Sequence, residues 1–101
     1  MGRRTIDLMK AVEHEIAGEK AFNLGRVGAR LDERLRELAT LATAVAQAAT
    51  PEERADCLAA HEACRLRALD DYYALTLQRE AMGVKHHDML AAMYPIPPKL
   101  K

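Results

Sequence analysis

Apolar residues recur at steps of three or four through the first half of the chain, and charged residues fill the positions between them. This spacing is typical of an amphipathic helix with a repeat close to a heptad. The stripe consists of Leu24, Val27, Leu31, Leu35, Leu38, Ala42, Val45 and Ala49. A similar stripe begins further upstream at Met9, Val12 and Ile16. The pattern therefore predicts helix on both sides of a segment that is rich in small residues.

That segment contains a ridge of small residues four apart. The ridge consists of Ala17, Ala21, Gly25 and Ala29, with Gly18 and Gly28 beside it. Residues four apart stack on one helical face, where small side chains let a neighbouring backbone approach closely. Each glycine costs about 1 kcal/mol inside a helix, so a break near Gly25 is the alternative. The regular phase of the ridge favours one continuous helix over residues 6–48, about 65 Å long at 1.5 Å per residue.

A second helix is predicted over residues 51–82. Thr50 and Pro51 suit the cap and first position of a helix, and Glu53 is placed to reach back to the Thr50 backbone. Gly83 provides the C-terminal stop. Two apolar stripes run along this helix, which is typical of a helix with two neighbours. One is Ala55, Ala59, Ala63, Leu66, Leu69, Tyr73 and Leu77, and the other is Cys57, Ala60, Cys64, Ala68, Leu75 and Met82.

The C-terminal part predicts a short third helix over residues 86–93, followed by an extended proline-rich tail over residues 94–101. We expect the tail to lie along its own domain, anchored by Tyr94 and Ile96. The whole chain of 101 residues is then a single all-α domain, a long helical hairpin with a short added helix. Because the first helix is longer than the second, its N-terminal part needs another partner, either a second chain or the C-terminal helix. A bundle-like homodimer with Ala17, Ala21, Gly25, Gly28 and Ala29 at the interface meets that need.

Composition and charge narrow the function classes. Fifteen basic residues balance fifteen acidic ones, whereas proteins that bind nucleic acids usually carry a basic excess. The sequence contains no secretory signal and no apolar run long enough to cross a membrane. We therefore expect a cytoplasmic protein that binds neither nucleic acid nor membrane.

The second helix carries the best candidate for a metal site. Cys57, His61 and Cys64 share one helical face, and thiolate and imidazole are good zinc ligands. Their spacing does not match that of known structural zinc motifs, and buried cysteines often act as small apolar residues. We therefore predict no metal or other cofactor, and keep these three residues as the alternative site.

Other chemistry-bearing residues do not form a recognisable catalytic set. His86 and His87 diverge at the start of the third helix, as do Asp70 and Asp71 within the second, and Tyr73 is expected in the core with its hydroxyl at the rim. The chain has no serine, and neither cysteine lies in a nucleophile motif. The sequence therefore favours a protein that is not an enzyme.

Several segments resemble an uncharacterised bacterial family of helical proteins of about 100 residues. The resemblance rests on Glu15–Ala17, Glu19–Ala21, Leu24–Leu31, Gln78–Val84 and the Tyr94-Pro95 ending. It implies fold and size, and it carries over no functional residue.

Together these observations predict a non-catalytic helical protein that oligomerises or binds a protein partner. A small helical metal- or ligand-binding protein that uses Cys57, His61 and Cys64 is the alternative.

Overall fold

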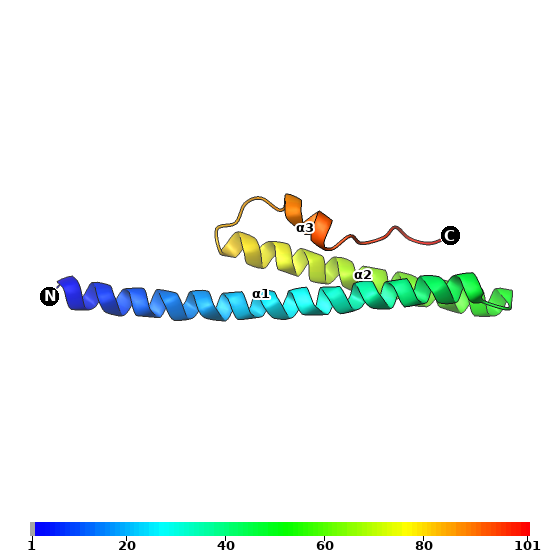
Figure 1. Cartoon of the computed structure of the whole chain (residues 1–101), viewed down its shortest axis with the longest axis horizontal. Coiled ribbons are helices and arrows are strands. Elements are labelled where there is room, and N and C mark those ends of the chain that lie inside the picture. The colour runs from blue at the N-terminus through cyan, green and yellow to red at the C-terminus, as the bar shows by residue number, and fades with distance from the viewer. Residues whose placement is uncertain (1) are drawn as a thin grey trace.

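The computed structural model describes the backbone of residues 2–101 and the side chains of residues 25–101. It contains α1 (Gly2–Gln47), α2 (Pro51–Ala81) and α3 (Asp88–Met93), with no strand among residues 2–101. The two long helices pack against each other as an antiparallel hairpin, and α3 and the tail lie along it (Figure 1). The predicted all-α hairpin with a short third helix is thus confirmed.

Helix α1 is continuous through the glycine-containing segment, as the phase of the small residues predicts. It starts at Gly2, four residues before the predicted start, and it extends past the end of α2 (Figure 1). The side chains of Ala17 and Ala21 lie outside the described residues, so their predicted interface role stays a prediction.

The hairpin turn is held by reciprocal capping bonds. The Thr50 hydroxyl accepts a hydrogen bond from the Glu53 N–H at 3.1 Å. The Glu53 carboxylate accepts one from the Ala49 N–H at 3.0 Å. The predicted carboxylate bond to the Thr50 backbone is therefore displaced by one residue. With Thr50 in an extended conformation, the N–H of the preceding residue meets the carboxylate.

Helix α2 stops at Gly83, as predicted. The N–H groups of Gly83 and Val84 donate to the carbonyls of Glu80 and Arg79 at 2.9 and 3.0 Å. These two bonds form a Schellman motif, which needs a left-handed residue after the cap. Gly83 supplies it with a φ of 90°. The chain then reverses and leads into α3.

Two glycine substitutions are expected to have opposite effects. Gly83→Ala forces a Cβ into the left-handed region and should lower the free energy of unfolding by about 1 kcal/mol. Gly25 lies within α1 with open space around its Cβ position, so Gly25→Ala should raise it by about 0.5–1 kcal/mol. Urea unfolding followed by circular dichroism measures both, and effects of the same sign would contradict these backbone assignments.

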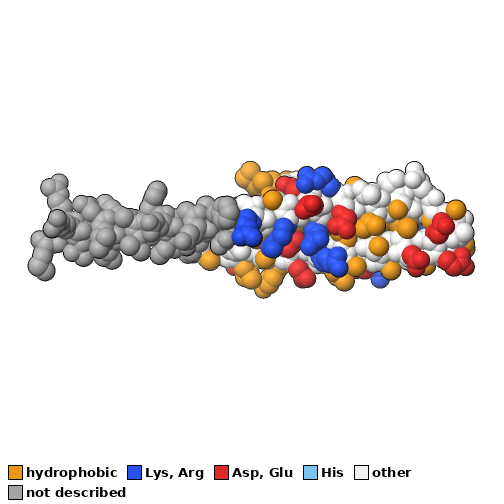
Figure 2. Space-filling model, turned by 90° about the horizontal axis from the view of Figure 1, so that it is seen from below, with side chains coloured by type: hydrophobic (Ala, Val, Ile, Leu, Met, Phe, Trp, Pro, Cys, Tyr) orange, Lys and Arg blue, Asp and Glu red, His pale blue; other side chains and the backbone are white. Residues whose placement is uncertain are grey.

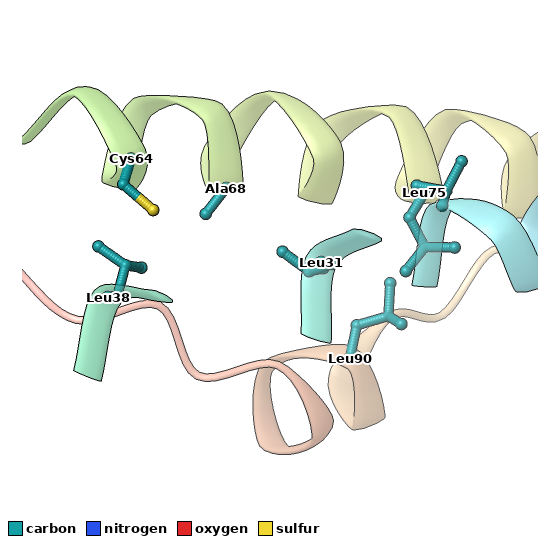
Figure 3. Close-up of a cluster of buried hydrophobic side chains, with 7 residues drawn as sticks. Leu31, Leu38, Cys64, Ala68, Leu75 and Leu90 are labelled. Carbon is teal, nitrogen blue, oxygen red and sulfur yellow. The ribbon is translucent and has the colours of Figure 1, made fainter. Parts of the chain in front are cut away.

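The core lies where α1, α2 and α3 meet. Its buried side chains are Val27, Leu31, Leu38, Cys64, Ala68, Leu75 and Leu90. Leu31, Leu38, Cys64, Ala68, Leu75 and Leu90 point toward one another from the three helices (Figure 3). The edge of the core carries an ion pair between the two long helices, because Arg34 lies 3.5 Å from Asp71. The core therefore uses one of the two apolar stripes predicted for α2.

The C-terminal tail runs back along the hairpin toward its turn (Figure 1). Tyr94 and Ile96 pack against the core as predicted, and Arg54 donates a hydrogen bond to the main-chain oxygen of Lys101 at 2.6 Å. Helix α3 starts at Asp88 instead of the predicted position 86, because the chain around His86 and His87 is still connecting α2 to α3. The tail thus acts as a third element of the hairpin domain.

Candidate functional site

The outer face of α2 is the most distinctive surface among residues 25–101, whose side chains the structure describes. We call it the outer strip, and it consists of Ala55, Ala59, Ala63, Leu66, Leu69, Tyr73 and Leu77, all of them exposed. Leu66 is 50% exposed, Tyr73 64% and Leu77 47%. Soluble monomers rarely leave a contiguous apolar surface of this kind uncovered, and such surfaces commonly mark interaction sites.

Helical geometry explains why the strip is uncovered. Cys64, Ala68 and Leu75 are buried against α1. Two residues further along from Cys64, or two before Leu75, a helical side chain points roughly the opposite way. Leu66 and Tyr73 occupy these positions and therefore lie on the side of α2 turned away from α1. The two predicted apolar stripes are both real, but within the described chain only one of them is covered by another helix.

The two adjacent tyrosines separate along the same boundary. Tyr72 is half-buried and packs against the core, whereas Tyr73 is exposed. The prediction that Tyr73 belongs to the core is therefore wrong. Consecutive helical residues point about 100° apart, and the C-terminal segment covers the side of α2 that Tyr72 occupies.

Acidic side chains border the strip. Arg65 donates two hydrogen bonds to Glu62, at 2.9 and 3.1 Å, and these bonds lower the pKa of the Glu62 carboxyl. Asp56, Asp70 and Glu80 are exposed around the same face. Arg67 is exposed beside the strip, three residues before Asp70. The outer strip therefore has an apolar centre and a rim whose charges are mainly negative.

The opposite side of the hairpin has a different character. Basic and acidic side chains are interspersed over the described part of the α1 side (Figure 2). Arg26, Glu33 and Arg36 are exposed on α1. This is the ordinary solvated face of an amphipathic helix, and it contrasts with the outer strip.

A cavity of about 400 Å³ lies between α2 and the C-terminal segment. It is lined by Leu69, Tyr72, Ala91, Tyr94, Pro95 and Ile96. Ligand sites combine an apolar lining with a few converging polar groups. Tyrosine hydroxyls are the only side-chain polar groups of this lining, and the Tyr94 hydroxyl lies against Gly28 of α1. The cavity is therefore an apolar hollow beside the outer strip.

The candidate metal ligands point into the helix interface. His61 and Cys64 are each 1% exposed, and the Cys64 thiol donates to the Arg34 carbonyl at 3.6 Å. Cys57 is half-buried. No three metal-ligating side chains among the described residues gather closely enough to hold an ion. The structure gives Cys64 the packing role in the core that the sequence analysis favoured over metal binding.

Because Cys64 is buried, the free energy of unfolding depends on pH in the alkaline range. Burial raises the pKa of its thiol above the ordinary value of 9.0. Above about pH 9 the unfolded chain therefore loses this proton before the folded chain does. Stability is full below that pH and falls as pH rises, by at most about 1.4 kcal/mol per pH unit for one proton.

Cys64→Ala is expected to flatten the decline between pH 8 and 10 relative to the wild type. Denaturant midpoints at several pH values measure it. Cys57→Ala keeps the buried thiol and should keep the steeper fall. Equal slopes for Cys64→Ala and the wild type would contradict this role of Cys64.

The remaining candidate residues do not converge. Asp71 pairs with Arg34 of α1, whereas Asp70 is exposed. His87 contacts the Glu80 carboxylate at 3.2 Å, and His86 is exposed. These pairs separate as expected for adjacent residues, and the structure brings none of them together as a catalytic dyad.

The small-residue ridge of α1 divides into buried and open positions. A Cβ on Gly28 would lie 2.8 Å from the Tyr94 hydroxyl, so Tyr94 occupies the space that this glycine leaves. Gly25 and Ala29 are exposed. In the described part of the ridge, one position, Gly28, therefore makes room for a side chain of the C-terminal tail. No sequence signal pairs Gly28 with Tyr94, which lies far along the chain.

Comparisons with known proteins add no relative. No protein-family model, curated protein or solved structure matches the chain. The resemblance to a bacterial helical family therefore stays a prediction. No helix among the described residues combines the length and apolarity needed to cross a membrane.

Proposed function

We propose that this protein is a non-catalytic helical interaction protein and that the outer strip of α2 docks a partner helix. The observation that carries the proposal is the exposure of Leu66, Tyr73 and Leu77 on one face of a well-capped helix. Burying such a face against a second amphipathic helix is a common mode of helix recognition. The homodimer predicted from the sequence uses another surface, the small-residue ridge of α1, and it stays a separate prediction.

Spacing and charge support a helical partner. The strip repeats at three- and four-residue steps over residues 55–77, and this period suits a second helix packed alongside. Asp56, Asp70 and Glu80 are exposed at its edges, which disfavours nucleic acids and anionic membranes. The unpaired Cys57 and Cys64 favour a reducing compartment such as the cytoplasm.

The metal-binding alternative has less support. It requires Cys57, His61 and Cys64 to face a common ion, and two of them are buried between the long helices. Elemental analysis of the purified protein separates the two functions. One zinc per chain would favour the metal-binding alternative.

Site-specific photo-crosslinking in cells that produce the protein tests the docking function. A benzophenone amino acid in place of Tyr73 keeps an aromatic side chain at a position that is 64% exposed. The control places it at Ala39, an exposed position on α1. We expect a discrete covalent adduct from position 73 and none from position 39. Absence of an adduct at 73, or equal labelling at both positions, would contradict the proposal.

A further inference from the structure

We infer that the occupant of the outer strip is a second copy of this chain, with two α2 helices packed antiparallel about a two-fold axis at Leu66. This inference rests on the proposed function and names its partner. Most soluble homo-oligomers form closed, self-complementary interfaces, and the two-fold dimer is the commonest. Such an interface requires a surface that matches itself after reversal.

The spacing of the strip is the same in both directions from Leu66. Going outward from it, the apolar positions fall three, seven and eleven residues away on either side. An antiparallel pair centred on Leu66 therefore sets each of these positions opposite an apolar position of the other copy. The facing pairs are Ala63 with Leu69, Ala59 with Tyr73, and Ala55 with Leu77.

Side-chain size is complementary in the same register. Before Leu66 the strip contains only alanines, and after it only large residues. An antiparallel pair matches Leu69, Tyr73 and Leu77 each with an alanine, while Leu66 faces its own copy at the axis. A parallel pair sets large residues against large ones and alanines against alanines, which leaves a gap at one end. Because protein interiors are closely packed, the antiparallel arrangement is favoured.

The area of the strip reaches the size of a specific interface. It extends over residues 55–77, about 33 Å at 1.5 Å per residue. Its four large side chains are 38–64% exposed. With the alanines and the stems of the bordering residues, each copy offers on the order of 600 Å² and the pair about 1,200 Å², the lower limit of standard interfaces. We therefore expect a reversible dimer with a dissociation constant on the order of micromolar.

The charges at the rim suit this arrangement. Arg67 and Asp70 lie on the same edge of the strip, three residues apart. The two-fold axis brings this edge of one copy beside the same edge of the other, where each Asp70 lies about 7.5 Å along the axis from Arg67 of the other copy, within reach of its long side chain. Glu62 is engaged by Arg65 of its own helix, and it lies on the other edge from Asp70. The mainly acidic rim thus contains a basic residue, Arg67, that faces the acidic rim of the other copy.

Cysteine pairs in purified full-length protein test the register. Helix axes 8–10 Å apart, with Cα atoms about 2.3 Å from each axis, place facing Cα atoms about 3.4–5.4 Å apart. That distance is compatible with a disulfide. In a Cys57→Ala background, Leu66→Cys should form a covalent dimer under mild oxidation. Ala39→Cys, exposed on α1, should remain monomeric.

A mixing experiment distinguishes disulfides that form in the proposed register from disulfides that form by random collision. Ala59→Cys and Tyr73→Cys proteins should each yield little dimer alone, since like positions lie about 21 Å apart along the pair. Mixing the two should raise the covalent yield at least fivefold. Dimerisation of Ala59→Cys alone at the level of the mixture, or a Leu66→Cys yield no greater than that of Ala39→Cys, would overturn the inference.

The adducts of the Tyr73 photo-crosslinker distinguish this inference from the broader proposal. An adduct of twice the chain mass supports both. An adduct only with another protein overturns self-pairing and leaves the docking function standing. Absence of any adduct overturns both.

Discussion

Replacing Leu31 with alanine is expected to lower the free energy of unfolding by about 3–5 kcal/mol, near the upper end for loss of a buried leucine. Leu31 is completely buried, and it lies between Ala68 of α2 and Leu90 of α3 (Figure 3). Three elements therefore lose contacts at once, and none of them easily fills the cavity. A loss of this size is a large share of the stability of a small domain.

Urea unfolding at low micromolar concentration measures this effect. Leu66→Ala is the matched control, because it removes the same atoms from a side chain that is half exposed. Its cost in the monomer should remain below about 1 kcal/mol. If both variants lose similar stability, Leu31 is not at the centre of the core.

Leu90→Ala is expected to release the C-terminal segment and to lower the free energy of unfolding by about 2–3 kcal/mol. Helix α3 has only six residues, far too few to persist in water without tertiary contacts. Leu90 is its one buried side chain. Without this anchor, residues 88–101 should separate from the hairpin while α1 and α2 stay paired.

Hydrogen exchange read by mass spectrometry resolves the two parts. Peptides covering residues 88–101 should lose protection in Leu90→Ala, and peptides covering residues 60–75 should keep most of theirs. Met89→Ala alters a neighbour that is 72% exposed and should leave the pattern unchanged. Uniform loss of protection over both segments in Leu90→Ala would show that the tail and the hairpin unfold as one unit.

Local signals predicted the helices well. The cap at Thr50 and the stop at Gly83 each combine several residues whose conformational preferences agree. The structure places the boundaries of α2 within one residue of the prediction. The phase of the small residues likewise predicted an unbroken α1. These features depend on neighbours in sequence, which is why sequence alone is enough.

Contacts between residues far apart in the sequence were harder to predict. Periodicity finds two apolar faces on α2, but it does not say which of them α1 covers. Tyr72 and Tyr73 show this, because they are adjacent and alike, yet the tail covers only Tyr72. The partner of Gly28 is Tyr94, and nothing local connects them. The candidate site was visible as a stripe, but its exposure emerged only from the fold.

Sedimentation equilibrium of the wild type and Leu66→Glu most directly tests the claim that the outer strip of α2 drives self-association. Glutamate favours helix, and Leu66 is half exposed, so the variant should keep its circular dichroism spectrum. At about 100 µM, well above the micromolar dissociation constant expected for this area, the wild type should approach twice the 11.2 kDa of one chain. Leu66→Glu should remain at the monomer mass, and Ala39→Glu should behave as the wild type. A monomeric wild type, or a Leu66→Glu variant that still dimerises, would contradict the account.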